Sequence, residues 1–172
     1  MHFTQTYLLL LLTLNCLTSI QEPSIINLSN TALDMAISED GSMIVIAYGA
    51  TKDAEVFTKA SDGFIFNESL PSSSGANNVA ISASNSILLK IGIGNVNYYT
   101  RGGGGNYQST QSSATSNAVL DTQICSTEEF MASSLGNNTF LLKKRDGGIF
   151  SDNMTESCSS GYPTKIGFSQ DC

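Results

Sequence analysis

A short motif recurs along this chain at intervals of 44, 44 and 43 residues, and this periodicity restricts the fold more than any other feature. The motif stands at residues 35–38 (MAIS), 79–82 (VAIS), 123–126 (QICS) and 166–169 (IGFS). Repeats of this length are single supersecondary units that bury their apolar faces by stacking against neighbouring copies. The chain is therefore expected to form a stack of similar units.

Each of the first three units has the pattern of four short strands. After the motif comes a turn and then an apolar run, at residues 43–48 (MIVIAY), 87–93 (ILLKIGI) and 130–135 (FMASSL). A hairpin follows, with its turn at residues 61–63, 102–105 and 145–147. Glycine in these turns accepts positive φ without a steric clash. Four antiparallel strands at a period of about 40 to 45 residues are typical of a β-propeller blade. A β-sandwich also has evenly spaced strands, but it gives no reason for the recurrence.

The sequence thus predicts an all-β fold, a partial β-propeller of about three four-stranded antiparallel blades plus the start of a fourth. The expected blade units are residues 30–74, 75–116, 117–160 and, truncated, 161–172. Closed propellers have about 4 to 8 blades. We therefore expect a fragment of a larger propeller, or a chain that needs missing blades or self-association to close.

Residues 1–21 are expected to be a cleaved signal peptide, and residues 22–172 to be secreted. The apolar run at residues 7–14 (YLLLLLTL) is too short for a bilayer, which needs about 20 residues, and no later run is long enough. The only histidine is His2, so the mature chain has no imidazole for a catalytic triad or a zinc site. Eight basic residues against 15 acidic ones argue against a nucleic-acid partner, whose phosphates require a positive surface.

The first two units resemble FG-GAP repeats, the blades of integrin-α-type propellers. Residues 35–50 (MAISEDGSMIVIAYGA) and 54–63 (AEVFTKASDG) follow the order of segments in that family, and residues 79–82 and 98–103 (YYTRGG) repeat it. WD-repeat blades share the turn and the strand order, and they are the close alternative. The resemblance implies a propeller fold for about residues 30–172.

The resemblance does not carry a calcium site over to this chain. Calcium-binding members of the family have an Asp-x-Asp-x-Asp-Gly loop, which surrounds the ion with oxygen ligands. The turns at residues 39–41 (EDG) and 61–63 (SDG) contain too few carboxylates, and the Phe-Gly pair expected before the motif is also missing. No cofactor and no metal site are predicted.

Acidic residues stand two places after three of the four motif serines. These residues are Asp40, Glu128 and Asp171, and Ser84 takes the remaining place. One interpretation is a ring of acids on one face of the propeller. The favoured interpretation is turn chemistry, because Asp and Ser side chains accept hydrogen bonds from nearby backbone N–H groups.

Three tyrosines and an arginine in the second unit form a candidate ligand surface. Tyr98, Tyr99 and Tyr107 lie near Arg101 in the sequence, and tyrosine offers a flat apolar face with a polar tip to a sugar or a peptide. The alternative is that these tyrosines alternate between the blade core and its outer face. The glycines at 102–105 lack the Lys-Ser/Thr that follows a phosphate-binding loop, so phosphate binding is not predicted.

Four sequons mark candidate N-glycosylation sites at Asn27, Asn67, Asn137 and Asn153. The chain is rich in Asn, Ser and Thr, so several sequons are expected by chance, and they permit modification without proving it.

Three cysteines remain after the leader, namely Cys125, Cys158 and Cys172. Two arrangements are open: one disulfide with one free thiol, or a disulfide to a partner cysteine beyond Cys172. Cys158 and Cys172 are not expected to pair, because a strand between them would hold their Cα atoms about 17–20 Å apart.

Together these features predict a secreted β-propeller that acts as a binding or adhesion scaffold for a protein or glycan ligand, without catalytic chemistry. One alternative is a propeller hydrolase or lyase that uses carboxylates at the blade ends, and another is a structural extracellular spacer. The lack of a mature histidine counts against the enzyme but leaves carboxylate chemistry open.

Overall fold

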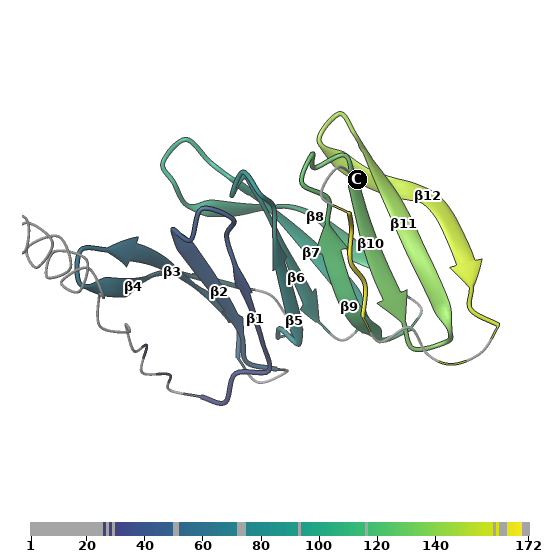
Figure 1. The fold of residues 1–172 in the computed structure, drawn as a ribbon, viewed down its shortest axis with the longest axis horizontal. Coiled ribbons are helices and arrows are strands. Elements are labelled where there is room, and N and C mark those ends of the chain that lie inside the picture. Colours follow the sequence, from purple (N-terminus) through teal and green to yellow (C-terminus); the bar gives the residue numbers. More distant parts are fainter. Residues whose placement is uncertain are drawn as a thin grey trace, which may run out of the picture.

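The computed structural model describes residues 26, 28, 30–49, 52–71, 75–92, 94–115, 117–159, 161 and 165–169. The predicted signal peptide, Asn27, Asp171 and Cys172 lie outside these residues. Within the described part, the chain forms three four-stranded antiparallel sheets and no helix, as the sequence predicted. The three sheets, here called blades 1, 2 and 3, stand side by side along the long axis of the molecule (Figure 1).

The blades have the same strand order. Blade 1 contains β1 (Asp34–Ile37), β2 (Met43–Ala47), β3 (Ala54–Ala60) and β4 (Gly63–Leu70). Blade 2 contains β5 (Asn78–Ile81), β6 (Ile87–Gly92), β7 (Asn95–Arg101) and β8 (Tyr107–Ala114). Blade 3 contains β9 (Val119–Ile124), β10 (Phe130–Leu135), β11 (Thr139–Asp146) and β12 (Ile149–Ser157). Consecutive strands pair in every blade, so the first strand forms one edge and the fourth strand the other.

The core consists of the apolar layers between blades. Met43 and Val45 of β2 pack in one cluster with Val79, Tyr99 and Tyr107 of blade 2. A second cluster joins blades 2 and 3, and it includes Leu89, Tyr98, Met131 and Phe150. Side chains from both faces of a blade are therefore buried. This explains why the strands read as continuous apolar runs in the sequence, whereas a strand covered on one face only would alternate apolar and polar residues.

The first strand of each blade (β1, β5 or β9) is here called the inner strand. The turn after each inner strand fixes the register of the repeat. Its left-handed residue is Gly41, Asn85 or Glu128, with φ values of 64°, 59° and 63°. The N–H of each of these residues donates to the carbonyl three residues earlier, namely that of Ser38, Ser82 and Cys125. Cys125, and not Ser126, thus occupies the motif serine position in blade 3. The predicted register of the third unit was wrong by one residue.

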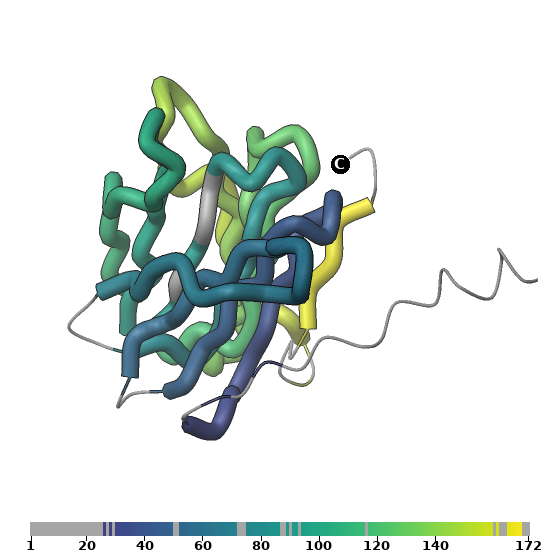
Figure 2. Tube along the Cα trace, turned by 90° about the vertical axis from the view of Figure 1, so that its left-hand side faces the viewer, coloured from purple at the N-terminus to yellow at the C-terminus, as the bar shows by residue number. Residues whose placement is uncertain are grey.

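The segment 165–169 starts a fourth unit beside blade 3. The Ile166 N–H donates to Asp121 Oδ2 of β9 at 2.8 Å, and the Val79 N–H of blade 2 donates in the same way to Asp34 Oδ2 of β1 at 3.0 Å. In the side view, β1 and this segment lie on the same side of the molecule (Figure 2). The segment therefore takes the place of the first strand of a further blade.

Two further predictions concern cysteines and membrane spans. Cys158 is an exposed free thiol, which confirms that it is not bonded to Cys172. Cys125 is buried and disulfide-bonded. No helix long and apolar enough to cross a membrane occurs in the part of the chain that the structure describes.

Candidate functional site

A concave surface runs across the first strands of the blades. We call it the inner groove; it is formed by β1, β5, β9 and the segment 165–169. Its larger hollow has a volume of about 520 Å³ and extends from Ile37 and Glu39 to Phe168 and Ser169. A second hollow of about 290 Å³ adjoins it between Asp34 and Lys165. Both volumes are close to or within the range of small-ligand sites.

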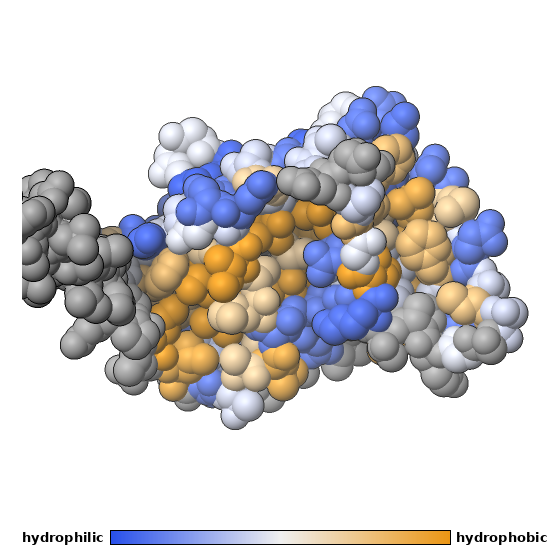
Figure 3. Space-filling model, in the orientation of Figure 1, coloured by the Kyte–Doolittle hydropathy of each residue, from blue (hydrophilic) through white to orange (hydrophobic). Residues whose placement is uncertain are grey.

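One apolar row lies along the larger hollow. Its members take equivalent positions on successive inner strands, and they are Ile37, Ile81, Ile124 and Phe168. Ile37 is 54% exposed, and so is its neighbour Met35. Figure 3 shows apolar side chains gathered over this part of the molecule, with polar side chains beside them. The groove therefore has an accessible apolar floor.

The buried carboxylate of Asp121 holds neighbouring strands together at one end of the groove. Asp121 is 1% exposed, and it accepts the Ile166 N–H and lies 3.7 Å from Lys165 Nζ. Asn78 Nδ2 of the preceding blade lies 3.5 Å from Asp121 Oδ1. Because these contacts occupy the carboxylate, its role in the groove is to fix the position of the fourth-unit segment.

Asp40 stabilises the turn of blade 1 and its contact with blade 2. Its carboxylate accepts the Ser38 hydroxyl at 2.7 Å and the Ser42 N–H at 2.9 Å, and Asn85 Nδ2 donates to both oxygens at 3.2 Å. The hydrogen bond from Ser38, followed by those from Ser42 and Asn85, holds the pKa of Asp40 well below its ordinary value. This is the turn chemistry that the sequence analysis favoured.

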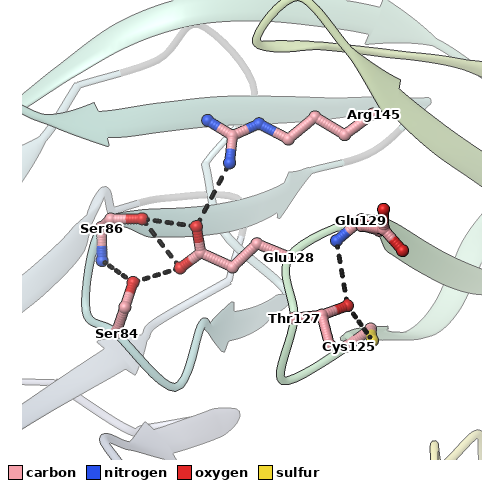
Figure 4. Close-up of polar contacts among 7 residues, drawn as sticks. All are labelled: Ser84, Ser86, Cys125, Thr127, Glu128, Glu129 and Arg145. Atoms are coloured by element: carbon pink, nitrogen blue, oxygen red, sulfur yellow. Dashed lines mark hydrogen bonds and ion pairs between the residues drawn. The ribbon is translucent and has the colours of Figure 1, made fainter.

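Glu128 makes the corresponding contact between blades 2 and 3 (Figure 4). The Ser86 hydroxyl lies 2.8 and 2.7 Å from its two oxygens, the Ser84 hydroxyl donates to Oε1, and Arg145 Nη1 lies 3.2 Å from Oε2. Partial burial raises the pKa of Glu128, but hydrogen bonds from Ser82, Ser84 and Ser86 and the charge of Arg145 outweigh burial and lower it.

Asp40 and Glu128 do not form the ring of acids that was the alternative interpretation. Glu128 occupies the left-handed turn position, whereas Asp40 stands one place earlier in its own turn, and Asp171 lies outside the described residues. Asn85 and Glu128, at equivalent positions, each reach back to the preceding blade. The sequence could not show this, because the one-residue shift in blade 3 hides the equivalence.

The tyrosines of the candidate ligand surface are buried, and this corrects the interpretation of them as a surface. Tyr98, Tyr99 and Tyr107 are 2%, 2% and 7% exposed. Tyr98 stacks on Phe150 of blade 3 at a centroid distance of 5.4 Å. Two successive tyrosines point to opposite faces of β7, and each face is covered by another blade. Only Arg101 is exposed, and its Nε donates to the Gly105 carbonyl at 3.0 Å.

Sequence analysis missed the inner groove. Its signal was present, since the third position of the motif is apolar in the first, second and fourth copies, at Ile37, Ile81 and Phe168. Among the residues that the structure describes, no three His, Cys, Asp or Glu side chains are grouped so that they could hold a metal ion.

Comparison with known proteins adds evidence on the fold. No protein-family model matches the chain, and no curated protein sequence matches it. Sqt1 of Saccharomyces cerevisiae has a similar solved structure, with a TM-score of 0.65 at 10% identity over 76% of this chain and 36% of Sqt1. The chain is β-propeller-like.

Two putative 6-phosphogluconolactonases have similar structures as well. The protein from Bacteroides uniformis ATCC 8492 matches with a TM-score of 0.66 at 14% identity, over 80% of this chain and 44% of that protein. The protein from Bacteroides fragilis NCTC 9343 matches with a TM-score of 0.61 at 12% identity, over 72% of this chain and 38% of that protein. The chain therefore spans less than half the length of these structures, and at such identities the likeness concerns the fold alone.

Proposed function

We propose that this protein is a secreted binding scaffold, built from FG-GAP-like propeller blades, that holds an apolar segment of a protein ligand in the inner groove. The observation that carries the proposal is the row formed by Ile37, Ile81, Ile124 and Phe168 on successive inner strands. An extended chain that lies across these strands meets one apolar side chain per blade. The exposed half of the Ile37 side chain gives such a ligand apolar area to bury.

A protein ligand suits this surface better than a glycan. Glycans are commonly held by exposed aromatic faces and polar groups, whereas the tyrosines of blade 2 are buried. Polar groups at the ends of the groove include Glu39 and Lys165. They can fix the orientation of a bound ligand, which apolar contacts alone do not.

The hydrolase or lyase alternative has weaker support. A general acid needs a carboxyl group that keeps its proton near neutral pH. The pKa values of Asp40 and Glu128 are both lowered, and their oxygens are occupied by hydrogen bonds that join turns and blades. These two carboxylates are better suited to holding the blades in place than to transferring a proton.

Peptide display tests the proposal. Peptides selected on the wild-type protein should be rich in apolar residues, and Ile37→Glu should weaken their binding at least tenfold. Ile149→Glu is the matched control, because Ile149 is similarly exposed, at 58%, but lies on the outer strand β12. Binding that survives Ile37→Glu would overturn the groove assignment. Turnover of a sugar-lactone or glycoside panel that is lost in Asp40→Asn would favour the enzyme, and a protein that selects no peptide and has no turnover would favour the structural spacer.

A further inference from the structure

The outermost strand of every described blade contains a β-bulge at the same place. In blade 1, Val56 pairs with Glu68 and Phe57 with Phe66, so that Asn67 is the extra residue. The same shift makes Thr110 the extra residue of β8 and Asn153 the extra residue of β12. A bulge residue is left out of the hydrogen-bond ladder, and edge strands commonly use bulges to stop pairing with other chains.

Two of the four sequons begin at these bulges. Asn67 and Asn153 are exposed, and so are the hydroxyl residues two places later, Ser69 and Thr155. The sequon at Asn137 lies instead in the turn between β10 and β11, where the Thr139 hydroxyl donates to the side-chain Oδ1 of Asn137. The equivalence of Asn67 and Asn153 is not visible in the sequence, because it depends on the strand register.

The edge strands that carry these sequons also expose large apolar side chains. In β4, Ile65 and Phe66 are 58% and 55% exposed, and in β12, Ile149 and Met154 are 58% and 41% exposed. The described part of β8 has no exposed large apolar side chain, and its bulge residue is Thr110. An exposed edge strand with apolar side chains is a site of aggregation unless something covers it. Sequons and apolar edges thus occur in the same two blades.

We propose that Asn67 and Asn153 carry N-linked glycans that shield the apolar outer edges of blades 1 and 3. In this modification, the asparagine Nδ2 displaces a lipid diphosphate from C1 of a lipid-linked oligosaccharide. A C–N bond forms, the C–O bond to the diphosphate breaks, and Nδ2 loses one proton. The proposal rests on the secretion that is part of the proposed function, but it does not depend on the inner groove.

Expression of the full chain with its own leader in cultured eukaryotic cells tests the modification. Glycopeptide mass spectrometry should find a glycan on Asn67 and on Asn153 in the protein from the medium. Asn67→Gln and Ser69→Ala should each remove the same single glycan, and Asn153→Gln and Thr155→Ala should each remove the other. Secreted protein with both asparagines bare would overturn this proposal alone. Bare protein retained in the cytosol would overturn secretion as well.

Thr110→Asn tests whether the bulge is the decisive position. The substitution completes a sequon with Ser112 at the equivalent place in blade 2, so one additional glycan is expected without loss of secretion. A secreted variant that lacks this glycan would contradict the idea that the bulge presents its side chain for modification.

Enzymatic removal of the glycans from the folded protein tests the shielding. Size-exclusion chromatography should then show larger species, and the variant Ile65→Ser/Ile149→Ser should keep its original elution volume after the same treatment. A wild-type elution profile that shows no larger species after deglycosylation would overturn the shielding role.

Discussion

At the scale of single residues, the polar side chains of the turns connect one blade to the next. Asn85 donates to Asp40 of blade 1, and Glu128 accepts hydrogen bonds from Ser84 and Ser86 of blade 2. Both residues occupy the left-handed position of the turn after an inner strand, which Gly41 takes in blade 1. A residue other than glycine adopts an unfavourable φ at this position. The contact across the blades offsets that cost.

Glu128→Gln should therefore destabilise the protein by about 1–3 kcal/mol at neutral pH, because the neutral amide has one acceptor oxygen in place of two and loses the attraction to the Arg145 guanidinium. The folded-state pKa of Glu128 lies below its ordinary value of 4.5. Its stabilising contribution is thus fully present above about pH 4.5 and is lost as the pH falls through the folded-state pKa. Urea unfolding of the wild type and the variant should give free energies that converge in acid. Glu129→Gln is the control, since Glu129 is exposed. A difference that stays constant with pH would refute the assigned role.

At the scale of strands and sheets, the sequence predicted more of the fold than of the site. Local signals, such as the apolar run of β2 and the Asp-Gly turn before β4, act within one blade and can be read directly. Contacts between blades depend on register, so the burial of Tyr98 and Tyr99 and the row at Ile37 could not be derived from composition. The one-residue shift of the repeat at Cys125 shows how far the sequence can predict these contacts. An error of one residue changes which side chain is assigned to the neighbouring blade.

Two tyrosines test how the blades are joined. The Tyr107 hydroxyl donates to the Asn85 carbonyl at 2.6 Å in a buried position, whereas the buried Tyr98 hydroxyl makes no hydrogen bond of ordinary length and angle with the described residues. Tyr107→Phe leaves a buried carbonyl unsatisfied and should cost about 1–3 kcal/mol of unfolding free energy. Tyr98→Phe keeps the stacking on Phe150 and should stay within about 0.5 kcal/mol of the wild type. Equal losses in the two variants would contradict this account of the interfaces.

At the scale of the whole molecule, the two end faces of the three-blade stack differ from the layers between blades. On the face of blade 1 that points away from blade 2, Met35 is 54% exposed. On the corresponding face of blade 3, Phe130 and Leu142 are half-buried. Apolar surface of this kind favours association, which the net charge of −7 opposes.

The full chain should therefore self-associate in a manner that depends on protein concentration and on salt. Added salt shortens the range of the repulsion between molecules of charge −7, so sedimentation velocity should show a larger weight-average mass at about 0.5 M than at about 0.05 M salt. Met35→Glu adds a charge to the end face of blade 1 and should shift the protein toward the monomer at both salt concentrations. Gln108→Glu adds the same charge to an exposed position on the outer strand β8, and it should have a smaller effect. If both variants reduce association equally, net charge rather than the apolar end face controls assembly, and the end face has no special role.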